Sequence, residues 1–382
     1  MNRFFFLLLI IAFSSCENTS NTNVDDIKSS FVQNYSTIAY KKYSDALFFV
    51  EVLRSDLDKF IEDPNENTYQ RLKTVWEHIR VPFGQSLVYR YINGPIDNNN
   101  YYYRINAPLI NTSLIETENE VENKGIINDL DNYPTIDKDL ISNLYLEQTS
   151  EHQDKTYAGI HVIEFLLWGS DESLDPLLSG DRTYQDFVND EFATRRLDYF
   201  IAVVELLIDD MRSLKEQWQE EQIFTNSLKN SNNIESLSLI YHGIIKFLDD
   251  DLSDRMLNRI LESNDTRYEE SPFSDFTLND IKYGVIGIEN MFTGSYSDTE
   301  GNVTQGDGIF RILEEIDSET RDDIKEKINN IKSLIATINV PFDYALNSPS
   351  ERQKLQDLHT QLKDLQQTLI NSAIDLDLRY QV

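Results

Sequence analysis

The chain has 382 residues, and its 66 acidic side chains outnumber its 34 basic ones, which gives a formal net charge of −32. Nucleic acids and anionic lipid headgroups are bound by basic surfaces, so we expect neither as a partner. The length is sufficient for one large domain or for two domains of ordinary size.

Residues 1–16 have the pattern of an export signal. A basic start and an apolar run over residues 4–12, too short to span a membrane, precede two serines and Cys16, the only cysteine. This arrangement resembles a bacterial lipoprotein signal in which Cys16 is lipidated; the alternative is an ordinary secretory signal. We expect an exported protein held in a bacterial membrane, with the outer membrane favoured, by its N-terminal lipid alone. Residues 17–25 would form a flexible tether.

Apolar residues recur at helical spacing along most of the chain. They predict helices at about 26–61, 68–91, 139–146, 159–168, 183–219, 234–247, 252–261, 278–291, 308–338 and 350–376. Alternation typical of strands joined by hairpin turns is absent. The sequence therefore predicts an all-α fold made of two tandem helical bundles.

Two stretches interrupt the helical pattern. The polar stretch 225–232 is the best boundary between bundles, so residues 26–224 would form an N-terminal helical domain and residues 233–382 a C-terminal one. Residues 92–137 show little regular patterning, and irregular excursions of such length are usually functional or disordered.

His161 and Glu164 are the only polar side chains inside the apolar segment 160–168. Three residues apart on a helix, they project from the same face, and burying them requires partners. They form either a hydrogen-bonded core pair or two ligands of a zinc or iron ion. The helical zinc-protease motifs fail, because Val162 and Phe165 occupy positions that those motifs give to Glu and His. One helix supplies at most two ligands, so a metal would need others from elsewhere.

Two further stretches are rich in groups that can form a buried network. Residues 80–97 are dense in Arg, Gln, Asn and Asp side chains, and a capped helix end with ion pairs is the alternative interpretation. Residues 270–296 are typical of a capped helix, with Ser274 or Asp275 as the N-cap. Glycines at positions 284 and 287 are costly inside a helix, which predicts close helix packing or a site there.

Together these stretches resemble the imelysin family, also described as M75 peptidase-like proteins. The family motif G-x-H-x-x-E is matched by Gly159, His161 and Glu164. An Arg-x-Pro-aromatic-Gly-Gln run leading into aromatic-Asn-Gly-Pro-Ile-Asp is matched by residues 80–97, and Arg104 begins the Arg-Ile-Asn that follows.

The resemblance extends over nearly the whole mature chain. Residues 251–256 and 270–296 match the C-terminal blocks, although Asp254 stands where a Gly-Glu pair is more usual. The resemblance implies a pseudo-repeat of four-helix bundles with a site where the halves meet. It also implies a place on the periplasmic or outer-membrane side of bacteria, often as a lipoprotein, and a link to iron regulation and uptake.

In this interpretation His161 and Glu164 are metal ligands, and Asp97 is the candidate third ligand. The supporting residues are Gly159, Arg80, Gln85, Asn93, Arg104, Ser274 and Asp275. The favoured function is a monomeric metal-binding lipoprotein for iron uptake or homeostasis, with iron or zinc as the bound ion and proteins of iron uptake as partners. The alternatives are an M75-type metallopeptidase that uses the same pair, with Glu164 as its catalytic group, and a small-ligand or surface-interaction module without catalysis.

Overall fold

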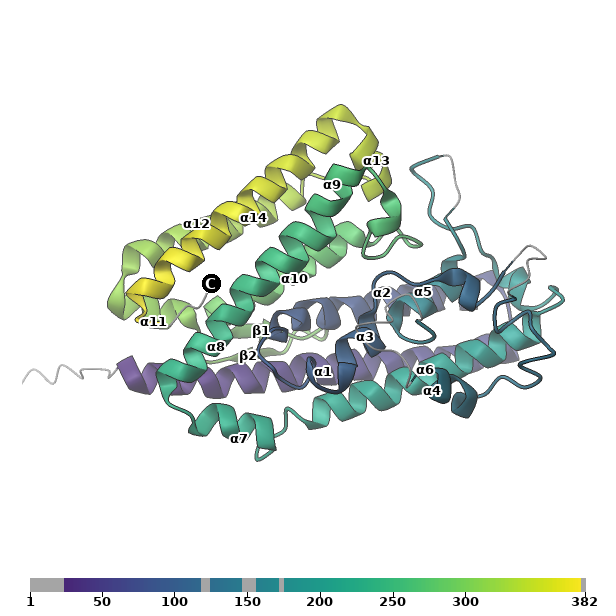
Figure 1. The fold of residues 1–382 in the computed structure, drawn as a ribbon, viewed down its shortest axis with the longest axis horizontal. Coiled ribbons are helices and arrows are strands. Elements are labelled where there is room, and N and C mark those ends of the chain that lie inside the picture. Colours follow the sequence, from purple (N-terminus) through teal and green to yellow (C-terminus); the bar gives the residue numbers. More distant parts are fainter. Residues whose placement is uncertain (1–23, 118–123, 146–155, 172–174, 379–382) are drawn as a thin grey trace, which may run out of the picture.

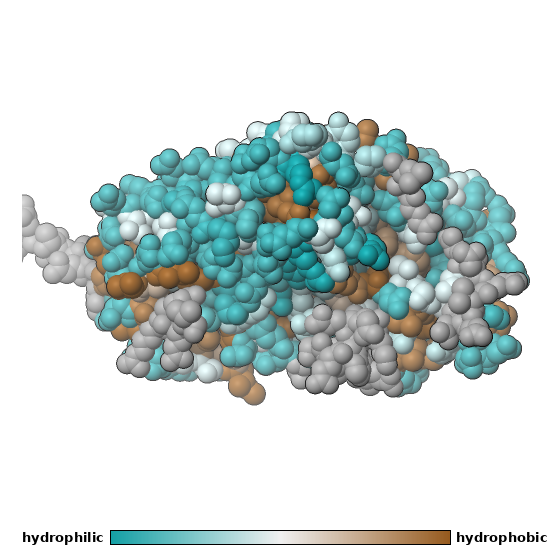
Figure 2. Space-filling view, turned by 45° about the horizontal axis from the view of Figure 1, so that its top comes forward, coloured by the Kyte–Doolittle hydropathy of each residue, from teal (hydrophilic) through white to brown (hydrophobic). Residues whose placement is uncertain are grey.

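The computed structural model describes residues 24–117, 124–145, 156–171 and 175–378 (Figure 1). The predicted signal peptide at 1–16, with Cys16, and nearly all of the predicted tether lie outside the described residues. The described chain is almost entirely helical, so the predicted all-α fold is confirmed. Among these residues no helix is both long and apolar enough to cross a membrane. Hydrophilic side chains cover most of the face seen in Figure 2, as the composition predicts.

The first half of the chain is built on a helical hairpin of α1(Val24–Glu62) and α2(Glu66–Ser86). Asn65 caps α2 by accepting hydrogen bonds from two backbone N–H groups of its first turn, in a capping box with Thr68. The long helix α6(Ala193–Glu216) packs along α1. The short helix α5(Ile160–Trp168) contacts both α2 and α6.

The second half forms another group of helices, coloured green to yellow in Figure 1. In it α8(Asn233–Lys246) continues without a break into the wider turns of the π-helix η5(Phe247–Asn258) and then into α9(Arg259–Ser263). The long helix α14(Pro349–Asp375) packs along η5 and α12(Ser318–Ile335). A π-helix is rare and is often found at functional sites.

The two halves are joined where α2 packs along α10(Thr277–Thr293). Gly287 lies at this contact, and a Cβ atom there would be 2.5 Å from the backbone oxygen of Gln85. A Cβ on Gly284 would be 2.5 Å from Leu252. The predicted role of these glycines in close helix packing is therefore confirmed.

The remaining elements are short. The helices are α3(Tyr101–Asn106), α4(Lys138–Tyr145), α7(Ile223–Asn230), α11(Ile309–Ile316) and α13(Phe342–Asn347), with 3-10 turns η1(Leu87–Tyr89), η2(Asn98–Asn100), η3(Thr112–Leu114), η4(Tyr184–Phe187) and η6(Thr266–Tyr268). A small antiparallel hairpin pairs β1(Ser295–Ser297) with β2(Val303–Gln305). The expectation of no hairpin is therefore wrong at this one place. The excursion 92–137 contains only short helical turns in its described part.

Several predicted elements differ from the structure. Thr183 does cap a helical turn, in a capping box with Asp186, but that turn is the 3-10 helix η4 and the long helix α6 begins ten residues later. The predicted helix 308–338 is divided, because Asp317 accepts two backbone N–H bonds and starts α12 afresh. Most of the boundary stretch 225–232 is the helix α7, and the division into two domains stays a prediction.

Substituting Gly287→Ala should lower the free energy of unfolding by about 1–3 kcal/mol, because the added methyl group would press against the backbone of α2. Urea unfolding followed by circular dichroism measures the change. Lys282→Ala, at an exposed position of the same helix, is the control and should change the stability by less than about 0.5 kcal/mol. Equal stability of the two variants would contradict the close packing of α2 and α10.

Candidate functional site

The helix α5 presents His161 and Glu164 to the contact between the two halves of the chain. Both side chains are buried, with exposed fractions of 1% and 0%. Gly159 caps this helix with a φ of 107°, a conformation that favours glycine. A Cβ there would lie 2.8 Å from the backbone oxygens of Arg104 and Ile105, so the motif glycine seats α5 against the end of α3.

Glu164 is fully engaged by hydrogen bonds. Its Oε2 lies 2.8 Å from His161 Nδ1. Its Oε1 accepts hydrogen bonds from the N–H groups of Phe273 and Ser274, each at 3.0 Å, and from the Ser274 hydroxyl at 2.8 Å. This carboxylate therefore orients the imidazole and ties α5 to the loop that precedes α10.

The other ring nitrogen of His161 faces Glu270. Nε2 is buried without a hydrogen-bond partner among the described residues and lies 3.8 Å from Glu270 Oε1. Glu270 is fully buried, accepts a hydrogen bond of 2.8 Å from Asn106 and forms an ion pair with Arg255. Arg80 Nη2 lies 3.6 Å from the same Oε1. Glu270 thus lies between an imidazole and two guanidinium groups.

Arg80 anchors a second carboxylate from the C-terminal half. Its Nε donates to Asp280 Oδ1 at 2.8 Å, and the Ser271 hydroxyl donates to Asp280 Oδ2 at 2.6 Å. Asp251 of the π-helix accepts from Arg90 and from Arg255. The charges of this buried network are the carboxylates of Glu164, Glu270, Asp280 and Asp251 and the guanidinium groups of Arg80, Arg90 and Arg255. A protonated His161 would balance them.

The pKa values in the network follow from this arrangement. Burial acts to lower the pKa of His161, but the hydrogen bond to Glu164 and the nearby carboxylate of Glu270 outweigh it and raise that pKa above its usual value. Burial acts to raise the pKa of Glu270, but Arg255, His161 and Arg80 hold it well below the usual range. Burial raises the pKa of Asp280 to about 6 despite Arg80. The metal-free site thus favours an imidazolium ion beside carboxylates.

Comparison with known proteins decides the family. The family model described as Imelysin matches residues 39–369, which is most of the chain. The chain belongs to the imelysin family.

A solved structure has the same fold as this imelysin-family chain. It is described as an iron-regulated protein A precursor from Parabacteroides distasonis, and it superposes with a TM-score of 0.68 at 17% sequence identity. The match covers 91% of this chain and 95% of that one. None of the curated proteins matches the chain.

The structure places Asp97 elsewhere than the predicted metal site. Its carboxylate accepts hydrogen bonds from the backbone N–H groups of Tyr91, Ile92 and Gly94, at 3.2, 3.1 and 3.3 Å. It thereby closes the turn after η1, and the carboxylate that faces Nε2 of His161 is Glu270. The prediction of Asp97 as the third metal ligand is corrected, because its carboxylate is bound to the backbone of this turn.

The supporting residues predicted from the sequence fall into two groups, those that contact the network around His161 and those that lie elsewhere. Arg80, Gly159 and Ser274 belong to the network around His161. Arg104 instead pairs with Asp210 at 2.7 Å. The other three have different surroundings. The backbone oxygen of Gln85 accepts a hydrogen bond of 3.0 Å from Lys42, and Asn93 is exposed. Asp275, which has a φ of 59°, follows Ser274 and does not cap α10 with its side chain.

Glu270, Asn106, Asp280 and Arg255 were not predicted as site residues. Each lies in or beside a block that matches the family pattern, and that match is the sequence feature that could have identified these residues. Their roles depend on contacts across more than a hundred residues of sequence, such as Asn106 to Glu270, which the pattern of one chain does not reveal.

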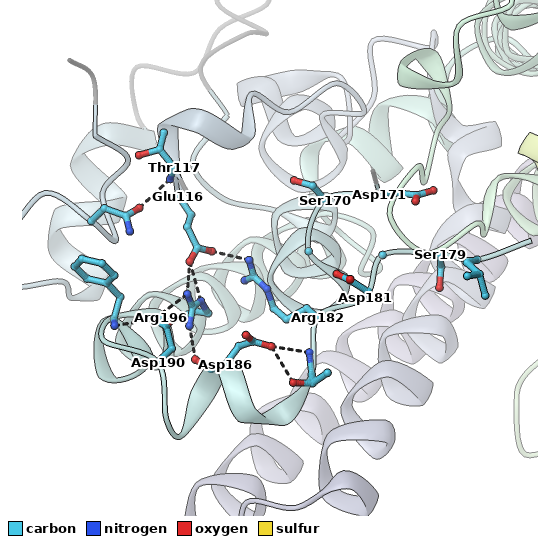
Figure 3. A pocket seen from close by; sticks show the side chains of 16 residues that line it. Glu116, Thr117, Ser170, Asp171, Ser179, Asp181, Arg182, Asp186, Asp190 and Arg196 are labelled. Carbon is cyan, nitrogen blue, oxygen red and sulfur yellow. Dashed lines mark hydrogen bonds and ion pairs between the residues drawn. The ribbon is translucent and has the colours of Figure 1, made fainter. Parts of the chain in front are cut away.

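A cavity of about 780 Å³ lies beside the end of α5 (Figure 3). Ser170, Arg182 and Arg196 are among its lining residues, and both arginines pair with Glu116. Neither His161 nor Glu164 lines this cavity. The family motif therefore lies beneath the surface and outside the cavity.

Replacing Arg80 by Met should lower the free energy of unfolding by about 3–5 kcal/mol, because Asp280 and Glu270 would lose a buried counter-charge. Chemical unfolding at pH 7 measures this loss. Arg267→Met is the matched control, since that arginine is exposed and pairs with the nearby Asp265 on the surface, and its effect should be small. A small effect of Arg80→Met would show that the network does not contribute to stability.

The raised pKa of His161 predicts a pH dependence of stability in metal-free protein. Protonation of His161 contributes stability that is complete below the unfolded-state pKa of about 6.5 and is lost as the pH rises through the higher folded-state pKa. The stability advantage of the wild type over His161→Gln should therefore shrink as the pH rises above about 6.5. Unfolding curves in chelator measure it, and NMR titration of the imidazole reports the pKa directly. An imidazole pKa below 6.5 would contradict the prediction.

Proposed function

We propose that this imelysin-family protein is an exported, lipid-anchored protein that binds a metal ion as cargo in iron uptake or homeostasis. The observation that carries the proposal is the environment of His161. Its Nε2 is buried without a hydrogen-bond partner among the described residues, while Nδ1 is fixed by Glu164. A metal-binding histidine commonly has this arrangement, with one nitrogen for the metal and the other hydrogen-bonded to a carboxylate.

The geometry favours different roles for the two glutamates. Glu164 uses both oxygens to accept hydrogen bonds, so it acts as the orienting partner of the imidazole and not as a ligand. Glu270 Oε1 lies 3.8 Å from Nε2, a separation suited to a nitrogen and an oxygen that share one ion. We infer that His161 and Glu270 hold the ion, and that Glu164 sets the ring orientation.

Charge supports a competition between a proton and the metal. Nε2 must lose its proton before it can bind a metal ion, and the metal then replaces the positive charge that balances the network. Arg80 and Arg255 stand close to Glu270 and limit the positive charge that the site accepts. Affinity for the ion should therefore fall as the pH is lowered through the raised pKa of His161.

Iron is the cargo that we propose. Support comes from the description of the structural neighbour as an iron-regulated protein, and from the imidazole and carboxylate donors, which suit iron as well as zinc. The lipoprotein-like signal that ends at Cys16 supports export and anchoring.

Metal analysis of untagged mature protein tests the proposal. Chelator-stripped protein is dialysed against iron or zinc and assayed by elemental analysis. The wild type should retain about one ion, and His161→Ala together with Glu270→Gln should abolish retention. Glu164→Gln should weaken binding by about 10- to 100-fold, as loss of an orienting carboxylate does. His359→Ala, on the distant helix α14, is the control and should bind like the wild type.

Other outcomes of the same experiment select another function. Unchanged binding in the double variant would rule out this site. Chelator-sensitive cleavage of an unfolded protein, lost in Glu164→Gln, would identify the metallopeptidase. That enzyme would require a peptide to reach a histidine that is 1% exposed. A co-purifying small molecule without metal would identify the ligand-binding module.

A further inference from the structure

Three aspartates from separate parts of the chain converge beside the family motif. Asp171 follows α5, Asp275 precedes α10, and Asp343 lies in the first turn of α13. One carboxylate oxygen from each lies within 4.8 Å of the other two. All three side chains are partly exposed, so water can reach the cluster.

A fourth carboxylate lies behind this cluster. Glu269 has an exposed fraction of 1%, and its Oε2 has no hydrogen-bond partner among the described residues. It lies within hydrogen-bonding range of Asp343, whose own Oδ1 is buried and likewise without a partner there. Ionised carboxylate oxygens only accept hydrogen bonds, so a proton or a cation must lie between two that face each other.

The charges around Asp275 differ from those around Glu270. Burial first, and then the carboxylates of Asp343, Asp171 and Glu164, raise the pKa of Asp275 to about 7, whereas Arg255 and Arg80 offset the charge of Glu270. Acidic side chains held this close repel one another unless a positive charge is bound.

We propose that Asp171, Asp275 and Asp343 bind a hard divalent cation of the Ca²⁺ class, with Glu269 as the buried carboxylate behind the ion. Ca²⁺ takes six to eight oxygen ligands at about 2.3–2.6 Å, so oxygens that share one ion lie up to about 5 Å apart. The aspartate oxygens meet this condition. The cluster offers no imidazole or thiolate, which favours Ca²⁺, Mg²⁺ or Mn²⁺ over softer ions, and water would complete the ligand shell.

The cluster is reached from two cavities. Asp171 lines the cavity of Figure 3, where its carboxylate is turned away from Glu116, and Asp275 lines a second cavity of about 480 Å³. Asp171 and Asp275 are therefore open to these cavities, whereas His161 lines neither of them.

The cation also has a structural consequence. Asp275 directly follows Ser274, which holds Glu164 through its N–H and its hydroxyl. An ion shared by Asp171, Asp275 and Asp343 would clamp the end of α5, the loop before α10 and the start of α13 together. The site is separate from the proposed iron site, and it stands or falls independently of that proposal.

Calcium titration of chelator-treated full-length protein tests the inference. Calorimetry at pH 8 should detect about one Ca²⁺ per chain, and a Ca²⁺ concentration of about 100 times Kd should raise Tm by several degrees. Mg²⁺ and Mn²⁺ serve as comparison ions. Asp275→Asn and Asp343→Asn should each abolish the rise. Asp181→Asn, which removes an acidic side chain from the cavity that Asp171 lines, is the control and should keep it.

The same variants are also measured without metal, which separates loss of the site from loss of folding. In chelator at pH 8, Asp275→Asn should melt about 2 °C or more above the wild type, because one of the mutually repelling charges is gone and Asn tolerates the positive φ. A variant that is more stable without Ca²⁺ yet gains nothing from it supports the site. His359→Ala, on helix α14, should keep the full response to Ca²⁺. If the wild type gains no stability from Ca²⁺, or if both aspartate variants gain as much as the wild type, the inference is overturned and a shared proton holds the cluster.

Discussion

The structure depends on burying charges of both signs between the two halves of the chain. Arg80 from the N-terminal half pairs with Asp280 and approaches Glu270 from the C-terminal half, and Glu164 binds the loop before α10 in return. Removing any one charge from such a network leaves another unpaired in a medium of low dielectric constant, which is costly. The halves are therefore held in one relative position by charge pairing as well as by the glycine-mediated contact of α2 with α10.

Much of this could be predicted from the sequence wherever the information is local. The helical spacing of apolar residues located most of the helices, and the three-residue spacing of His161 and Glu164 placed them on one face, where the structure finds them hydrogen-bonded. The block with Arg80 was also identified correctly as part of a network. These predictions succeeded because helix period and side-chain direction are properties of neighbouring residues.

The failures concern information that is not local. Asp97 follows an Asn-Gly-Pro turn, and its carboxylate binds the backbone of that turn, a common use of Asp that the sequence could have suggested. Glu270 could not be paired with His161 because only the folded chain brings them together. The cap at Thr183 was real, yet it starts a single 3-10 turn, since a capping box specifies where a helix begins and not how far it continues.

The burial of His161 affects the rate of exchange at its Nε2 atom as well as the energy of the site. An ion or proton that reaches Nε2 must pass the buried side chains around it, among them Glu270, Asn106 and Arg80. Exchange at Nε2 then requires a local opening of the packing around the imidazole, and diffusion to the protein surface does not limit it. Exchange of the proton on Nε2 should therefore be slow compared with exchange at an exposed imidazole.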